Sequence, residues 1–279
     1  MAYKNLLVHL DPSKSSAKRA DAAIALAAKH GAHLTALAAT ATPSVPSYVE
    51  AQIPAAVFEQ ARASLMEGLD EIGETFEKKA KAAGISYEFR KELAQEPLAA
   101  LISRHTRYAD LAILGQSDPD DPLSPEPELS EDVILACGRP VLMVPYIGVM
   151  QEPGKKVVVA WDAGREAARA VNDAMPLLEA ADSVVVLIVN PKRGASAHGA
   201  EPGADIATHL ARHGVKVDVK VYTQRDLSVA DVILSRISDE GVDMVVMGAY
   251  GHARLREMVL GGVTREMFRS MTVPLFMSH

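Results

Sequence analysis

Cysteine is almost absent from this 279-residue chain, in which Cys137 is the single one. A disulfide framework needs pairs of cysteines, so the class of small secreted proteins held together by disulfides is excluded. A lone thiol in an apolar stretch is more typical of a buried structural side chain than of a reactive group. We therefore expect a protein of the reducing cytoplasm.

Long apolar runs and clusters of basic residues are also missing. A membrane-spanning helix needs about 18 or more consecutive apolar residues, and the chain contains no such run. Nucleic-acid binding needs Lys and Arg gathered together to neutralise phosphates, whereas the formal net charge is −7 and no basic block stands out. We expect neither a membrane nor a nucleic-acid partner.

Aromatic residues make up only 5% of the chain, although 48% of its residues are hydrophobic. The core must therefore be built from Ala, Val, Leu and Ile, a composition that suits helices packed on a parallel sheet. At roughly 150 residues per domain, the length favours two domains over one.

The sequence repeats itself once. Residues 4–11 and 156–162 are both short apolar runs that end in Asp, and each is followed by an Ala-rich helical stretch. Later in each half, a second apolar run ends in glycine, at Gly115 and at Gly248. Matched signposts in the same order indicate an internal duplication. We expect domains at residues 1–147 and 154–279, joined by a linker within residues 146–155.

Strands alternate with helices in both halves, which predicts an α/β fold with parallel sheets. We expect two tandem doubly wound domains, each a five-stranded sheet of order 3-2-1-4-5 with helices on both faces. Ligands of such folds bind beyond the carboxyl ends of the strands. Asp162 and Gly248 both stand at such ends.

The two halves differ in two stretches. The first half has a long apolar helical face from Phe58 to Ala83. It also reads GQSDPDDPLSPEPELS from Gly115, where the second half reads GAYGHARLREMVLGGVT. Acidic side chains repel phosphate and proline removes backbone donors. We expect a solvated, mobile loop over residues 118–128 that does not bind a polyphosphate.

Glycines are spaced in the second half as Gly248-x2-Gly251-x9-Gly261, followed by Gly262, Val263 and Thr264. Glycine lets the backbone turn tightly and approach a ligand closely. Backbone N–H groups that lead into a helix N-terminus form an anion site. The alternative is a tight loop with no ligand, in which Thr264 only caps the helix.

The duplication, the Asp at each strand end and the glycine spacing together resemble the universal stress protein family, in its tandem two-domain form. The resemblance covers nearly the whole chain. It implies a stress-response protein that binds an adenine nucleotide, ATP with Mg²⁺, in the C-terminal domain and acts through a change of conformation or protein partner. It also implies an intramolecular pseudo-dimer, in which residues 141–144 pair with residues 273–277, and leaves a homodimer open.

The resemblance assigns nucleotide contacts at the ends of the first, second and fourth strands and in the glycine loop. These residues are Ala160, Trp161, Asp162, Val189, Gly248, Gly251, Gly261, Gly262, Val263 and Thr264.

Other interpretations stay open beside this one. The family often has Ser or Thr directly after the third glycine, and Gly262 lacks that hydroxyl. Asp162 could instead fix the turn that follows it. The chain has no P-loop and no GxSxG elbow, so no catalytic set emerges. The rival functions are a scaffold that binds no nucleotide and a slow ATPase.

Overall fold

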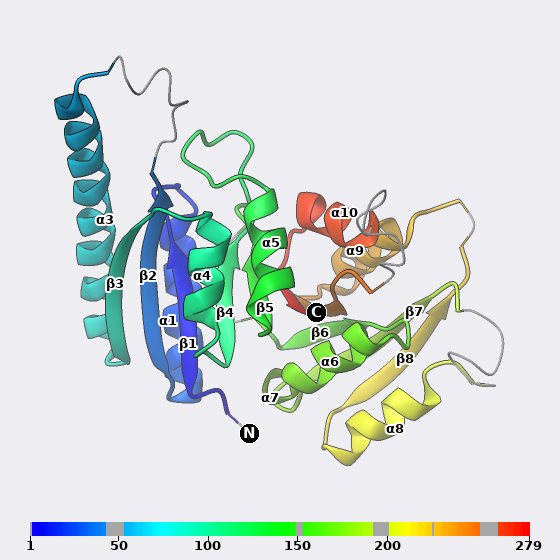
Figure 1. Ribbon diagram of the computed structural model, residues 1–279. Helices are drawn as coiled ribbons and strands as arrows, with labels where there is room; N and C mark the ends of the chain where they lie inside the picture. The colour runs from blue at the N-terminus through cyan, green and yellow to red at the C-terminus, as the bar shows by residue number, and fades with distance from the viewer. Residues whose placement is uncertain (1, 43–52, 149–152, 192–200, 225, 252–261) are drawn as a thin grey trace. The chain divides into compact units, whose positions relative to one another are not determined.

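The computed structural model describes residues 2–42, 53–148, 153–191, 201–224, 226–251 and 262–279. Two compact units divide the chain (Figure 1). The N-terminal unit comprises Tyr3–Cys137, and the C-terminal unit comprises Gly138–His279 together with Ala2.

The N-terminal unit alternates strands and helices along the chain and pairs its strands in the order β3-β2-β1-β4, all parallel. This is the expected order for its first four strands. Its elements are β1 (Asn5–Leu10), α1 (Ser16–His30), β2 (His33–Ala41), α3 (Ala55–Ala83), β3 (Ser86–Ala94), α4 (Leu98–Thr106), β4 (Leu111–Gly115) and α5 (Glu128–Cys137).

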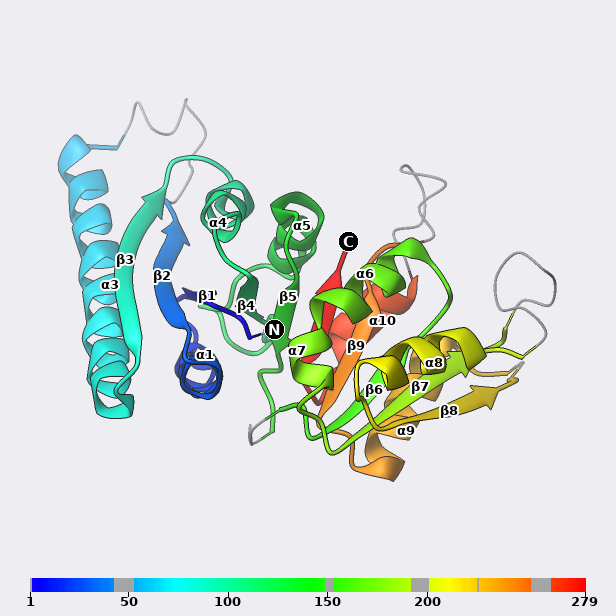
Figure 2. The same cartoon turned by 90° about the horizontal axis from the view of Figure 1, so that it is seen from below.

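Helices cover both faces of this sheet (Figure 2). α1 and α3 pack on one face, whereas α4 and α5 pack together on the other. The central strands β1 and β4 are aliphatic, as expected, and are buried along almost their whole length, whereas the edge strand β3 (SYEFRKELA) is largely polar. Burial on both faces explains why β1 and β4 read as continuous apolar runs.

The C-terminal unit has the strand order β5-β10-β9-β6-β7-β8. The part from β10 to β8 confirms the expected order 3-2-1-4-5, read in reverse. Its elements are β5 (Val141–Val144), β6 (Lys156–Ala160), α6 (Arg165–Asp173), α7 (Met175–Leu178), β7 (Ser183–Val189), α8 (Ala204–Arg212), β8 (Val217–Tyr222), α9 (Val229–Glu240), β9 (Met244–Gly248), α10 (Gly262–Ser270) and β10 (Leu275–Ser278).

β5 and β10 form the antiparallel pair of this sheet, with Leu275 opposite Met143 and Met277 opposite Val141. This confirms the pairing expected between the last strands of the two repeats. Because of it, β5 groups with the C-terminal unit and the division falls at Gly138. Residues 149–152 of the expected linker lie outside the described residues, and the boundaries 1–147 and 154–279 stay a prediction.

The two halves also share hydrogen bonds between an Asp side chain and the backbone at the start of the first strand. The Asp110 carboxylate accepts bonds from the backbone N–H groups of Lys4 (2.7 Å) and Asn5 (2.9 Å). The Asp243 carboxylate accepts equivalent bonds from Gly154 (2.8 Å) and Lys155 (3.1 Å). In both units, an Asp just before the fourth strand therefore fixes the start of the first.

The long helix expected in the first half is present as α3. Its buried residues lie only in its second half and include Gly73 and Phe76. A Cβ at Gly73 would lie 2.6 Å from the Phe89 ring, so glycine lets β3 pack against this turn. None of the helices in the described parts of the chain is long and apolar enough to cross a membrane.

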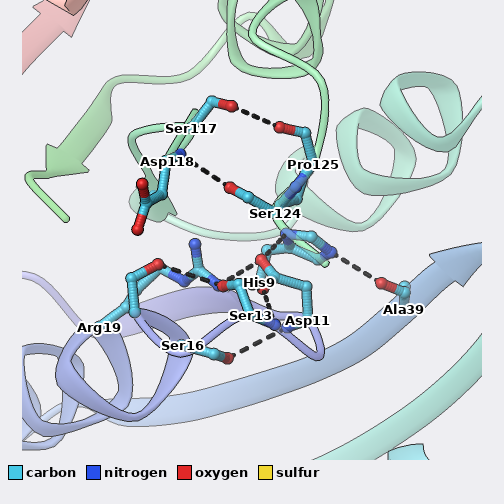
Figure 3. A network of polar contacts seen from close by, with 12 residues as sticks. His9, Asp11, Ser13, Ser16, Arg19, Ala39, Ser117, Asp118, Ser124 and Pro125 are labelled. Atoms are coloured by element: carbon cyan, nitrogen blue, oxygen red, sulfur yellow. Dashed lines mark hydrogen bonds and ion pairs between the residues drawn. The ribbon is translucent and has the colours of Figure 1, made fainter. Parts of the chain in front are cut away.

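Beyond the end of β1, the N-terminal unit is filled by its own side chains (Figure 3). The buried Arg19 guanidinium donates to Oδ2 of the buried Asp11. Oδ1 of Asp11 accepts from the backbone N–H of Ser13 at 2.9 Å. A Cβ at Gly115 would overlap Nη1 of Arg19. Arg19 therefore occupies the space between α1 and the end of β4.

The loop over residues 118–128 is exposed at most of its positions, as expected, and its mobility stays a prediction, but hydrogen bonds fix its turn. Asp121 is 5% exposed, and its Oδ2 accepts from the backbone N–H of Lys14 at 2.8 Å. Within the loop, the Asp118 N–H donates to Oγ of Ser124 at 2.8 Å (Figure 3). The carboxylate of Asp121 thus satisfies a backbone donor and helps to order the turn, which the acidic sequence alone did not indicate.

The pKa values of both His9 and Asp11 are lowered from their ordinary values. Burial lowers the pKa of His9 from 6.5 to about 4, so the ring is neutral and Nε2 donates to the Ala39 carbonyl at 3.0 Å. Burial by itself raises the pKa of Asp11, but the charge of Arg19 and the hydrogen bonds from Ser13 outweigh it and leave the pKa lowered. A buried ion pair therefore stands beside a histidine that stays uncharged.

Acid should destabilise the N-terminal unit through His9. The unfolded histidine takes up a proton near pH 6.5 while the folded one resists until about pH 4, so stability falls as the pH drops through this interval. The loss amounts to about 3 kcal/mol. Urea titrations of wild type and His9→Gln between pH 7 and pH 4 measure it. In the variant, the free energy of unfolding should fall by about this much less between pH 7 and pH 4. The same fall in both proteins would exclude His9 as its source.

Removal of Arg19 should leave Asp11 as an unpaired buried charge. We expect Arg19→Met to lower the free energy of unfolding by about 3–5 kcal/mol. The double variant Asp11→Asn with Arg19→Met should regain much of that loss, because the Asn oxygen still accepts from Ser13. Chemical denaturation of both variants tests the pair, and equal losses in the single and double variants would contradict it.

Candidate functional site

A cavity of about 410 Å³ opens at the carboxyl ends of β6, β7 and β9 in the C-terminal unit. Its volume lies in the range of small-molecule sites. All but one of the residues expected at a nucleotide site line it, and Gly261 lies outside the described residues. Those that line it are Ala160, Trp161, Asp162, Val189, Gly248, Gly251, Gly262, Val263 and Thr264.

The chain turns sharply after each of the three strands. Ala163, Asn190 and Tyr250 have φ angles of 59°, 51° and 59°, and they are the non-glycine residues with positive φ in the described parts of the chain. This left-handed conformation is uncommon outside glycine and clusters at binding sites. These three residues follow closely on the strand ends that line the cavity.

Part of the cavity lining is apolar, and we call this part the slot. The side chains of Trp161, Leu187 and Val189 come from the strand ends, and Val229 and Ile233 come from α9. Leu187 and Ile233 are buried, whereas Trp161 and Val189 are partly exposed and form the accessible walls. Such a slot accommodates a flat apolar ring system.

The backbone of Val189 offers polar groups to this slot. The backbone polar groups of Leu187 point toward β6, because its carbonyl accepts from the Trp161 N–H at 2.9 Å. The backbone polar groups of Asn190 point the other way, toward β8, because its N–H donates to the Tyr222 carbonyl at 2.8 Å. Alternation along a strand turns Val189 to the same side as Leu187. β6 ends its pairing at Leu187, so the N–H and C=O of Val189 point past it, toward the slot.

Asp162 has the structural role that the sequence left open. Its side chain is exposed, and Oδ1 accepts from the Gly164 N–H at 2.8 Å, which fixes the turn into α6. Asp11 is buried at the matching position and pairs with Arg19. The residue that stands where Arg19 does, eight positions after the Asp, is the fully buried Ala170.

The glycines at the other end are required by close packing. A Cβ at Gly248 would lie 2.5 Å from the backbone N of Ala167 and 2.6 Å from the carbonyl carbon of Glu166. A Cβ at Gly251 would lie 2.9 Å from Oε2 of Glu166. The end of β9 therefore rests directly on the first turn of α6. Gly262, in contrast, has open space around its Cβ position.

Thr264 joins the glycine turn to α10. It is 4% exposed, and its Oγ1 accepts from the backbone N–H of Tyr250 at 3.3 Å. The hydroxyl thus holds the segment after β9 against the first turn of α10. The first N–H groups of an α-helix have no partner within the helix, and Gly262 and Val263, which begin α10, line the cavity.

Glu166 is a pocket residue that the sequence analysis missed. It is 6% exposed, stands in the first turn of α6 and lines the cavity beside Gly251. Burial by itself raises the pKa of Glu166, but a hydrogen bond from Nε of Arg165 outweighs it and lowers the pKa. The position four residues after Asp162 at a helix start was the available signal.

Seven further lining residues were missed. They are Ala167, Leu187, Asn190, Val229, Ile233, Met247 and Tyr250. Most are apolar and reach the pocket only through the packing of α9 and the strand ends. Among the described residues, no three His, Cys, Asp or Glu side chains are gathered to hold a metal ion.

Comparison with known proteins identifies the second half directly. Residues 154–279 match the model of the universal stress protein family. Universal stress protein Slr1230 of Synechocystis is 29% identical over 66 residues, which span 24% of this chain and only 22% of that relative.

Solved structures share the fold of the whole chain. A universal stress protein from Archaeoglobus fulgidus superposes with a TM-score of 0.72 at 17% identity, covering 98% of this chain and 95% of the other. A putative universal stress protein from Pseudomonas aeruginosa gives 0.61 at 15% identity, covering 99% and 93%. The second half of the chain, residues 154–279, thus matches the universal stress protein family, and the whole chain shares the fold of these structures.

Proposed function

We propose that the C-terminal unit binds an adenine nucleotide, ATP together with Mg²⁺, and that binding changes the conformation of this unit or its affinity for a protein partner. One observation carries the proposal. A single cavity joins an apolar slot with a free strand edge to a glycine-lined end that leads into a helix N-terminus. Adenine suits the first and phosphate the second.

The slot supplies what adenine recognition requires. Trp161 and Val189 offer apolar surface to a flat ring. The N–H and C=O of Val189 offer one donor and one acceptor in the plane of β7, and the adenine edge carries an amino donor beside a ring-nitrogen acceptor. A pyrimidine would fill less of the slot.

At the other end, the described residues that would meet phosphate offer mainly backbone groups. The start of α10 presents N–H groups and the positive end of the helix dipole, which favour an anion. Gly248 and Gly251 leave the cavity open where any side chain would meet α6. No metal cluster is built from the described residues, so Mg²⁺ would enter with the phosphates, near Asp162 and Glu166.

The N-terminal unit acts as support in this proposal. Gly115 stands where Gly248 does, but Arg19 fills the space beside it. Asp121 ties the loop after β4 to Lys14. Together these contacts occupy the position that the pocket has in the other unit.

A ligand at the start of α10 would affect strands beyond the pocket. α10 is followed directly by β10, and β10 pairs with β5. Thr264 couples α10 to the turn after β9. A shift of α10 on binding would therefore reach the antiparallel β5–β10 pair, which is the element we propose to change with ligand.

The single tryptophan of the chain makes ligand binding directly measurable, because Trp161 lines the pocket. We expect adenosine and MgATP to change its fluorescence with saturation in the micromolar range. Val189→Trp should weaken binding at least about tenfold by filling the slot, measured by calorimetry because it adds a second indole.

Val221→Trp is the matched control, since Val221 lies on the neighbouring strand, 45% exposed and outside the pocket. It should bind as wild type does. If wild type retains no nucleotide and binds neither ligand, the chain is a scaffold and the proposal fails. Phosphate release during the same titrations would reveal a slow ATPase.

Gly262 provides a gain-of-function prediction. Space around it is open, so Gly262→Ser should add the hydroxyl that relatives often carry and tighten MgATP binding about three- to tenfold. Gly262→Ala controls for the effect of a side chain on the helix start. The prediction fails if Ala tightens binding as much as Ser does, or if Ser also tightens adenosine.

A further inference from the structure

Glu166 lies at the end of the pocket assigned to phosphate. Its Oε2 is 2.9 Å from the Cβ position of Gly251, and its Cβ is 2.9 Å from the Cβ position of Gly248. Both glycines belong to the turn that would border the phosphates. The base slot is formed by other residues, at the ends of β6 and β7.

The carboxylate is held in place by its own helix. Glu166 is the second residue of α6, where the helix dipole favours a negative charge. The α6 N-terminus is therefore already supplied with an anion by the chain. Arg165 bonds to Glu166, but its side chain is 88% exposed, so its charge is screened by water far more than that of the buried carboxylate.

Arg165 and His279, which lie outside the cavity lining, help to lower the pKa of Glu166, and residues 252–261 lie outside the described residues. None of the described residues that line the cavity is Lys, Arg or His, whereas Asp162 and Glu166 are acidic. A phosphate chain entering here meets backbone dipoles on the α10 side and a buried carboxylate on the α6 side. Like charges in a poorly screened site repel strongly.

We propose that Glu166 makes the pocket select against uncompensated phosphate charge, so that adenosine and adenosine monophosphate bind more tightly than metal-free ATP. The inference rests on the proposed nucleotide function and refines it. Mg²⁺ neutralises part of the phosphate charge and therefore reduces the difference in affinity between adenosine and ATP. Glu166 is thus a specificity-determining residue, and the glycine turn alone does not set the preference.

The experiment measures dissociation constants of the full-length protein for adenosine, AMP and ATP in EDTA, and for ATP with Mg²⁺. Calorimetry and Trp161 fluorescence give independent values. Glu166→Gln removes the charge and keeps an oxygen that accepts from Arg165. Asp205→Asn is the matched control, because Asp205 is the second residue of the nine-residue helix α8 and lies outside the pocket.

In wild type we expect metal-free ATP to bind at least about tenfold more weakly than adenosine. Glu166→Gln should reduce this ratio about tenfold while the adenosine constant changes less than about twofold, and Asp205→Asn should leave both constants unchanged. The unchanged adenosine constant also reports that the variant is folded.

Two results separate failure of this inference from failure of the function. If wild type binds adenosine and metal-free ATP equally well, or if the ratio is the same in Glu166→Gln, the selectivity proposal is overturned and the nucleotide site stands. If wild type binds none of the ligands, both are overturned. If Glu166→Gln loses adenosine binding, Glu166 does more than repel phosphate and the selectivity proposal is overturned.

Discussion

The close contact between Gly248 and the first turn of α6 fixes the pocket. No side chain separates the end of β9 from the backbone of Glu166 and Ala167. This contact brings the α6 N-terminus, its carboxylate and the turn at Gly251 to one end of the cavity. The slot formed by β6, β7 and α9 then extends from that point, and α10 closes the other side through the Thr264–Tyr250 bond.

The two units differ in what packs against the glycine at the end of the fourth strand. Each ends its fourth strand in glycine next to its first helix. In the C-terminal unit the helix backbone itself lies against that glycine, and space remains beyond the strands. In the N-terminal unit Arg19 lies over Gly115 and neutralises Asp11, and the loop after β4 is tied down through Asp121. One duplicated sequence thus yields an open pocket and an internally filled one.

Much of this followed from sequence because the signals were local. Apolar runs ending in Asp or Gly predicted the strands and their order, and the glycine spacing predicted the lining at Gly248, Gly251 and Gly262. The pairing of β5 with β10 came from the family resemblance. These features depend on residue type and spacing along the chain.

The remainder depended on contacts between distant residues. Arg19 in a helix reads as a solvated cation until the fold places Asp11 and Gly115 around it. Asp121 reads as loop charge, and its bond to Lys14 spans 107 positions. Glu166 reads as a helix-start carboxylate, and only the packing of β9 on α6 brings it into the pocket.

The most direct test of the central claim is photolabelling of the full-length protein with 8-azidoadenosine, followed by peptide mapping. The account predicts that label falls on peptides at the ends of β6 and β7, near Trp161 and Val189, and that excess adenosine removes it. Label confined to peptides from Tyr3–Cys137, or label that adenosine does not displace, would contradict a nucleotide site in the C-terminal unit.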